Sequence, residues 1–520
     1  MTARPNIVIV LADDLGFSDI APFGGEIDTP NLTRLSDRGI RMSSYYVTPR
    51  CSPSRAALMT GQNPHSVGIG VLTTDNRPNG YPGSLSTEVP TIAEHLSGRG
   101  YSCGLFGKWH LSSDIENPGE TWPTRRGFEE FHGILQGSSG YFRPRLMDGE
   151  ERVPEHEMTE DFHLTDHVTQ RAVDFIRRQG EAETPFLAML TYTAPQWPLH
   201  AREEEIAKYR ERYAGGWDGM RQQRLEGLHR EGLYSEIHGV ADGQELPAWG
   251  EHAQWEIERM SVYAAQVEAM DRGIGAVLDS LEETGVAEDT LVLFFSDNGG
   301  CAEELPTDNP HFPRKTEPRT TRTGDPVRFG NDPAIMPGPA DTFQSYGVNW
   351  ATVSNTPFRK WKSWVHEGGI STPFLASWPA GGIPSGGAVS PDLGHITDIL
   401  PTVLDIVGAD RVGVGRSLLS SWQHPDQEGP ERTLCWEHIG NAAVRRGRWK
   451  LVREWGSPWE LYDLTTDRIE AHDLSPQHPE LVAELEQVYS QWCEEQGVID
   501  WQDVLDDHAA RGLAPGQATS

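Results

Sequence analysis

Short, nearly continuous apolar runs constrain the fold of this chain more than any other feature. The runs span residues 6–12, 101–106, 185–192, 290–295 and 373–378. They lack the polar alternation of half-exposed strands and are typical of parallel strands that are covered on both faces. Between them, residues 257–281 carry apolar side chains at spacings of three and four, which predicts an amphipathic helix, and a second helix is expected at 395–407. This alternation predicts an α/β fold, with a mostly parallel sheet sandwiched by helices.

The pattern changes after about residue 410. Residues 433–438, 442–452 and 460–464 have the character of antiparallel strands, with Arg446-Gly447 as a turn, and residues 479–496 are expected to form a helix. We therefore predict a first domain at residues 1–410 and a smaller C-terminal α+β subdomain at 411–520 that carries an antiparallel sheet. The aperiodic segment 302–350 is expected to form a wall of the active site, and the chain from about residue 509 to fray.

The composition of the chain excludes some classes of binding partner. The chain has 520 residues and a formal net charge of -33, which argues against nucleic acid and anionic membranes as partners. No apolar stretch reaches the length of a transmembrane helix, and the N-terminal apolar run is too short for a secretion signal. The five cysteines are scattered and odd in number, so we expect free thiols and a cytoplasmic protein.

Two pairs of oxygen-bearing residues follow predicted strands. Asp13-Asp14 end the first strand, and Asp297-Asn298 end the strand at 290–295. Ligands of open α/β sheets bind beyond the carboxyl ends of the strands, and clustered carboxylates attract hard cations. A helix cap or a turn would explain Asp13-Asp14 alone equally well. Together the two pairs predict one Ca²⁺ or Mg²⁺ site.

A nucleophile-capable residue stands at a predicted helix start. Cys51 is followed by Pro53, which suits a first helical turn, and Gly61 is suited to end the helix. The N-terminus of a helix favours anions, and Arg55 lies one turn further on the same side. A nucleophile, an anion site and a guanidinium would thus coincide. For Cys51 alone, a buried structural cysteine is the alternative interpretation.

Several segments together resemble one family. The string C-S-P-S-R-A-A-L-M-T-G at residues 51–61 is similar to the signature of the type I sulfatases, whose first residue is converted to Cα-formylglycine. Further stretches resemble bacterial arylsulfatases: A-D-D-L-G-F-S-D-I from 12, G-K-W-H-L from 107, F-S-D-N-G from 295, N-T-P-F-R-K-W-K from 355 and E-G-G-I-S-T-P from 367. The resemblance covers roughly residues 5–500. It implies an alkaline-phosphatase-like sheet, a catalytic domain at 1–410 and the family's small second domain.

The resemblance implies roles for individual residues. The metal ligands would be Asp13, Asp14, Asp297 and Asn298, completed by the modified Cys51.

The resemblance also implies roles for the cationic and basic residues. Arg55 would hold the aldehyde hydrate, and Lys362 would bind a sulfate oxygen near the leaving group. Lys108 and His110 would serve the nucleophile and the sulfate, and because they lie two residues apart, an extended segment would aim both the same way.

One position departs from the family pattern. Many relatives have A-P-H-W-P-L where this chain has Gln196 in A-P-Q-W-P-L, followed by His200. Either His200 replaces the missing histidine as the group that protonates the leaving oxygen, or Lys362 acts alone.

The function that the resemblance implies is hydrolysis of small aryl or alkyl sulfate monoesters. We expect a Ca²⁺ cofactor (Mg²⁺ is the alternative), a formylglycine-generating enzyme as the maturation partner, and a monomer or small homo-oligomer. A phosphonate monoester or phosphodiester hydrolase of the same superfamily is the nearest alternative, and a non-catalytic metal-binding protein of the same fold is a remote one.

Overall fold

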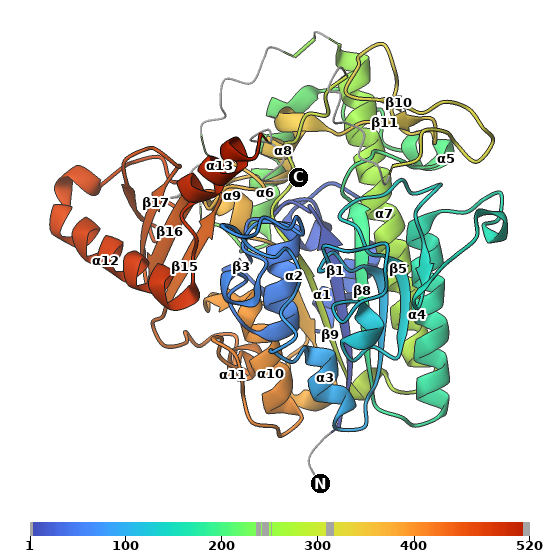
Figure 1. The fold of residues 1–520 in the computed structure, drawn as a ribbon, viewed down its shortest axis with the longest axis horizontal. Coiled ribbons are helices and arrows are strands. Elements are labelled where there is room, and N and C mark those ends of the chain that lie inside the picture. Colours follow the sequence, from blue (N-terminus) through green and yellow to red (C-terminus); the bar gives the residue numbers. More distant parts are fainter. Residues whose placement is uncertain (1–3, 236–240, 242–248, 251, 308–316, 513–520) are drawn as a thin grey trace.

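The computed structural model describes residues 4–235, 241, 249–250, 252–307 and 317–512 (Figure 1). Within them a ten-stranded sheet has the order β13-β2-β12-β9-β1-β8-β4-β5-β6-β7. Its five central parallel strands are β9 (Thr290–Ser296), β1 (Asn6–Asp13), β8 (Phe186–Pro195), β4 (Ser102–Lys108) and β5 (Glu130–Ile134). The predicted α/β class, with its mostly parallel sheet, is confirmed.

The fifth predicted run behaves differently from the other four. Strand β12 (Phe374–Ser377) pairs antiparallel with β9. The chain before β12 stays at the carboxyl edge of the parallel strands, where Lys362 contacts Asp14. The next strand therefore enters the sheet from that edge and runs in the opposite direction. The remaining edge strands are β2 (Ile40–Met42), β13 (Ala388–Ser390), β6 (Met147–Asp148) and β7 (Glu151–Arg152).

Helices cover both faces of the sheet, as the apolar strands require. Along β1, Val8 and Val10 belong to one hydrophobic cluster, and Ile7 and Ile9 belong to the other. The first cluster packs under α1 (Pro30–Asp37), α4 (Leu164–Glu181) and α7 (Ala253–Glu283); the second packs under α2 (Cys51–Thr60), α3 (Ile92–Ser97) and α10 (Ile399–Ile406). The helix expected at 257–281 is confirmed as part of α7, and α10 lies within the one expected at 395–407.

Shorter elements connect these layers. The helices are α5 (Glu203–Ile206), α6 (Gly216–Arg230), α8 (Gly347–Ser354), α9 (Glu367–Ile370) and α11 (Leu419–Gln423); the paired short strands are β3 (Tyr45–Tyr46) with β14 (Gly394–His395) and β10 (Arg328–Phe329) with β11 (Thr342–Phe343). The segment expected to wall the site thus contains β10, β11 and the first half of α8, while its residues 308–316 lie outside the described part of the chain.

The C-terminal part forms a separate layer, on the left of Figure 1. Strands β15 (Thr433–His438), β16 (Asn441–Arg446), β17 (Trp449–Arg453) and β18 (Glu460–Asp463) make the predicted antiparallel meander, followed by α12 (Pro479–Gln496). Helix α13 (Trp501–Ala510) was not predicted. It includes the first two residues of the segment that was expected to fray, and residues 513–520 of that segment lie outside the described part of the chain. Trp422 of α11 still packs in the large core, so the boundary at residue 410 stays a prediction.

Buried charges join the two layers. Lys450 of β17 lies 2.9 Å from Glu367 and 2.8 Å from Glu470, and all three side chains are inaccessible to solvent. Within the described residues, no helix is long and apolar enough to cross a bilayer.

Candidate active site

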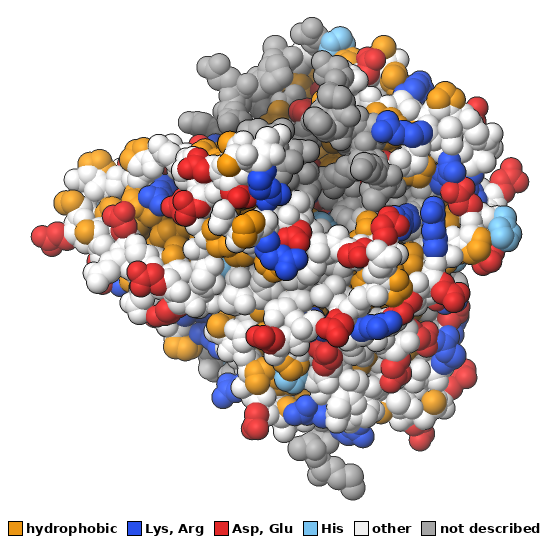
Figure 2. All heavy atoms as spheres, viewed as in Figure 1, with side chains coloured by type: hydrophobic (Ala, Val, Ile, Leu, Met, Phe, Trp, Pro, Cys, Tyr) orange, Lys and Arg blue, Asp and Glu red, His pale blue; other side chains and the backbone are white. Residues whose placement is uncertain are grey.

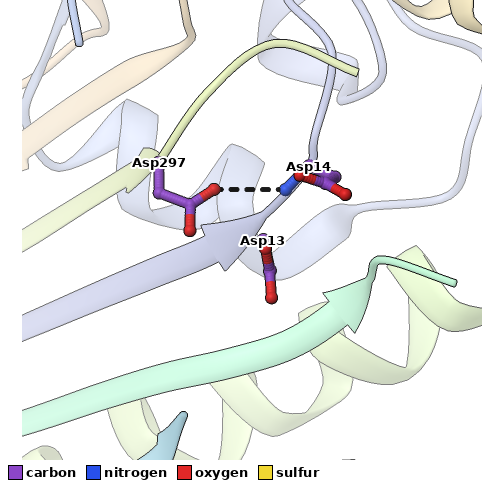
Figure 3. Close-up of side chains that lie close together, drawn as sticks. All are labelled: Asp13, Asp14 and Asp297. Atoms are coloured by element: carbon purple, nitrogen blue, oxygen red, sulfur yellow. Dashed lines mark hydrogen bonds between the residues drawn. The ribbon is translucent and has the colours of Figure 1, made fainter. Parts of the chain in front are cut away.

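Three buried carboxylates meet at the carboxyl edge of the sheet (Figure 3). Asp13 ends β1, Asp14 follows it, and Asp297 follows β9, the neighbouring parallel strand. Each offers an oxygen atom within 4.8 Å of the others. The Asp14 backbone N–H donates to Asp297 Oδ1 at 3.3 Å. Asp14 has a φ of 67°, a strained conformation of the kind that concentrates at functional sites.

Each carboxylate has its own cation. Lys108 Nζ lies 2.7 Å from Asp13, and Lys362 Nζ lies 2.8 Å from Asp14. Arg55 donates from Nε and Nη2 to Asp297 Oδ2 at 3.0 and 2.8 Å. Burial alone would lower the pKa of Lys362, but the charge of Asp14 raises it well above its usual range, so this ammonium stays charged.

The cluster fits a hard divalent cation. Burial raises the pKa of Asp13 to about 7, against the opposing effect of Lys108, and the neighbouring Asp297 and Asp14 add to the rise. Asp13 Oδ1 and Asn298 Oδ1 are buried without a hydrogen-bond partner in the described structure, whereas Asn298 Nδ2 donates to Asp14 Oδ1 at 2.7 Å. Oxygen ligands of this kind suit Ca²⁺ or Mg²⁺, and a cation would relieve the repulsion and use both unpaired oxygens.

Cys51 occupies the first position of α2, as predicted. The helix ends at Gly61, whose φ of 64° is left-handed. Cys51 Sγ lies 3.4 Å from His110 Nδ1, and both residues are buried. One turn further, Arg55 Nη1 donates to the Lys108 carbonyl at 2.7 Å. Helix α2 therefore carries both Cys51 and Arg55, the residue that binds the Asp297 carboxylate.

The prediction that an extended segment aims Lys108 and His110 the same way is wrong. Strand β4 ends at Lys108, and His110 has a φ of 56°. Lys108 turns toward Asp13, whereas His110 turns toward Cys51. The left-handed residue redirects the chain, so one short segment supplies two different sides of the site.

Gln196 lies in the cluster, but His200 has other partners. Gln196 Oε1 is 3.4 Å from Lys108 Nζ, and with its amide reversed the nitrogen would donate to Asp13 at 3.1 Å. Reversal also lets the nitrogen donate to the Gly137 carbonyl at 2.8 Å, so two contacts between acceptors become hydrogen bonds while the longer contact with Lys108 is lost, and we favour it. The His200 ring accepts from the Tyr141 backbone N–H at 3.2 Å and donates to the Thr342 carbonyl at 2.7 Å. Both ring nitrogens are thus used by backbone groups, which weighs against His200 as a proton donor.

Two groups near the site were not identified from the sequence. Cys51 shares an apolar cluster with Val71, Leu72, Tyr81 and, from the unpredicted α13, Trp501 and Val504. That Cys51 belongs to the same cluster as a helix that begins 450 positions later has no local sequence signal. Arg50 and Glu303 form an ion pair of 2.8 Å beside Cys51, and only the adjacency of Arg50 to Cys51 could have drawn attention to it.

Cys51 beside His110, three buried cations and a carboxylate cluster thus lie together at the carboxyl edge of an α/β sheet. Comparison with known proteins identifies the family. The model of the Sulfatase family matches residues 5–409. An uncharacterised sulfatase of Schizosaccharomyces pombe is 30% identical over 95% of this chain and 94% of its own length. The arylsulfatase of Klebsiella aerogenes is 32% identical over 78% of this chain and 87% of its own.

Solved structures support the same fold. The crystal structure of Ps i-CgsB in complex with k-i-k-neocarrahexaose has a TM-score of 0.70 and 23% identity, and the match covers 99% of both chains. The chain therefore belongs to the sulfatase family and is a sulfatase enzyme with the alkaline-phosphatase-like fold.

Proposed function

We propose that this sulfatase hydrolyses small aryl or alkyl sulfate monoesters and that Cys51, oxidised to formylglycine by a separate maturation enzyme in the cytoplasm, is its nucleophile. The observation that carries the proposal is the position of Cys51. Cys51 is the first residue of α2, and its Sγ lies 3.4 Å from His110 Nδ1. Arg55, one turn further along the same helix, binds Asp297 of the carboxylate cluster.

A divalent cation, expected to be Ca²⁺, would be held by Asp13, Asp14, Asp297 and Asn298, together with the modified Cys51. When bound, it would withdraw charge from a sulfate oxygen and favour the ionised form of a hydroxyl nucleophile.

The remaining chemistry belongs to the residues of the chain. One hydroxyl of the hydrated formylglycine gives its proton to Asp297, its oxygen attacks sulfur, and the S–O bond to the alcohol breaks. The second hydroxyl then gives its proton to His110, the C–O bond to the sulfate group breaks, and the aldehyde is restored. Serine or cysteine could not perform this second step because neither carries two hydroxyls on one carbon. Lys108 and Lys362 would stabilise the negative charge on the sulfate oxygens.

Leaving-group protonation is the role that Gln196 does not supply, because an amide cannot deliver a proton. We propose that the charged Lys362, beside Asp14, protonates the leaving oxygen. His200 is neutral and both of its ring nitrogens are hydrogen-bonded to backbone groups, so we do not assign it this role.

The surroundings of the site favour a small substrate with an apolar alcohol. The cluster of Val71, Leu72, Tyr81, Trp501 and Val504 provides an apolar wall beside Cys51. The chain carries a net charge of -33, and among the described residues visible in Figure 2, acidic and basic side chains are interspersed without a broad basic patch. A polyanionic polymer would find little attraction on that face.

A direct test compares para-nitrophenyl sulfate with the matching aryl phosphonate monoester, using Ca²⁺-loaded protein co-expressed with a formylglycine-generating enzyme. We expect kcat/KM to be higher for the sulfate by at least about tenfold, because differential transition-state binding sets such ratios. The same protein with Cys51→Ala is the matched control and should turn over neither. A preference for the phosphonate would replace our proposal with the phosphonate hydrolase alternative.

A further inference from the structure

An ionic clasp links the loops that carry three of the site residues. Glu303 Oε1 accepts from Arg50 Nη1 at 2.8 Å, and Glu303 Oε2 accepts from Trp197 Nε1 at 2.9 Å. Arg50 Nη1 also donates to Ser363 Oγ at 2.7 Å. We refer to Arg50, Trp197, Glu303 and Ser363 as the clasp.

Besides Glu303, each of the other three members of the clasp is the immediate neighbour of a site residue. Arg50 precedes Cys51, Trp197 follows Gln196, and Ser363 follows Lys362. The backbone repeats the link, since Ser363 N–H donates to the Pro49 carbonyl at 2.7 Å. A shift of the Glu303 carboxylate would therefore be transmitted to the nucleophile, to Gln196 and to Lys362 at once.

The clasp also affects the net charge beside the site residues, because it pairs Glu303 with Arg50. Inside the site, three carboxylates are matched by Lys108, Lys362 and Arg55. Arg50 is a fourth cation, its side chain only 11% exposed, and its Nε has no partner within the described residues. Glu303 neutralises Arg50, and its own side chain is 33% exposed, so this carboxylate beside the site residues is accessible to solvent.

We propose that Glu303 is a positioning residue that also selects the substrate: it holds the three loops in register and, because it neutralises Arg50 and is accessible to solvent, disfavours sulfate esters whose alcohol carries a second negative charge. This inference rests on the proposed function and narrows it to esters with an uncharged or cationic alcohol part.

The test uses two esters of equal size, para-nitrophenyl sulfate and para-carboxyphenyl sulfate. Glu303→Gln removes the negative charge of Glu303, so Arg50 loses this ionic partner and keeps its hydrogen bond to Ser363. We expect kcat/KM for the carboxyphenyl ester to rise relative to the nitrophenyl ester by about fivefold, the effect of one unit charge acting over roughly 8 Å at an effective dielectric constant of about 40, between the values for a protein surface and for bulk water. An unchanged ratio would overturn the selectivity.

Glu303→Asp separates positioning from charge. Aspartate keeps the charge but is one methylene shorter, so it cannot reach both Arg50 and Trp197. We expect kcat to fall about tenfold for both esters with KM and the ratio unchanged, because misplacements of about 1 Å cost this much or more. Wild-type kcat in this variant would refute the positioning role.

The adjacent Glu304 offers a matched control. Its side chain is 51% exposed and pairs with Arg259 of α7 at 3.0 Å, away from the clasp. Glu304→Gln removes a carboxylate from the same loop, and we expect it to change neither kcat nor the ratio. A ratio shift as large as that of Glu303→Gln would show that loop charge in general, and not the clasp, is responsible.

Binding measurements distinguish this inference from the proposed function. Titration calorimetry of Ca²⁺-loaded Cys51→Ala protein, with and without Glu303→Gln, gives the affinity for each ester without turnover. We expect the same fivefold relative gain for the carboxyphenyl ester. A wild-type protein that hydrolysed neither ester would contradict the proposed function, yet this affinity ratio would still decide the role of Glu303.

Discussion

Replacement of His200 by alanine should damage stability and leave leaving-group chemistry intact. The ring bonds two backbone groups, Tyr141 N–H and the Thr342 carbonyl, and the residue is 3% exposed. Each buried group left without a partner costs about 1–3 kcal/mol, and water entering the vacated space would recover part of that. We expect His200→Ala to lower the free energy of unfolding by about 2–4 kcal/mol, measured by urea denaturation followed by tryptophan fluorescence.

The protonation state of His200 gives a second, independent test of its structural role. Burial lowers the pKa of His200 to about 4, so at pH 7 only about one ring in a thousand carries the proton that a general acid needs. The folded pKa lies below the value of 6.5 expected in the unfolded chain, so the unfolded state binds more protons between these values. This residue therefore makes the protein less stable as pH falls from 6.5 to 4, by up to about 3 kcal/mol, and His200→Ala should remove that part of the acid sensitivity.

Activity measurements provide the refutation. If His200 is structural, His200→Ala should change kcat/KM for an alkyl sulfate and for para-nitrophenyl sulfate by the same small factor. The reasoning fails if the alkyl ester slows more than about tenfold relative to the nitrophenyl ester, the pattern of a lost general acid, while the urea midpoint stays at the wild-type value.

Further outcomes follow from the same site. Lys362→Ala should slow the alkyl ester much more than para-nitrophenyl sulfate, by about tenfold or more in relative kcat/KM, because the poorer leaving group depends more on a donor; equal losses would remove Lys362 from that role. Peptide mass spectrometry of active protein should find an aldehyde at Cys51, and full activity of a homogeneous thiol form would contradict the mechanism. Chelation should abolish turnover, Ca²⁺ should restore it, and Asp297→Asn should weaken Ca²⁺ binding by calorimetry; tight Zn²⁺ binding through cysteine would contradict this site. Trp501→Ala should raise KM for naphthyl sulfate about three- to tenfold through loss of apolar contact, with a smaller rise for methyl sulfate, and equal KM changes would exclude α13 from the substrate wall.

Local sequence determined the elements and their chemistry. Apolar runs predicted the central strands because a strand covered on both faces needs apolar side chains on both. The pairs Asp13-Asp14 and Asp297-Asn298 follow strands that prove to be neighbours, and parallel strands bring their carboxyl ends to one edge of the sheet. Gly61 ends α2 where the sequence predicts, because its φ of 64° suits glycine. These features depend on a few consecutive residues and can be inferred from them.

Tertiary structure alone decided how distant groups meet and which way side chains turn. Strand β12 runs antiparallel because of the path of the preceding loop, and His110 turns toward Cys51 because of its own left-handed backbone. His200 is neutral because burial lowers its pKa, and both of its ring nitrogens are occupied because Tyr141 and Thr342, 59 and 142 positions away, supply their partners. Glu303 joins Arg50 across 253 positions of sequence. Such pairings depend on the packing of the whole chain. The type of a residue indicates that it needs a partner, but only the tertiary structure shows which residue that partner is.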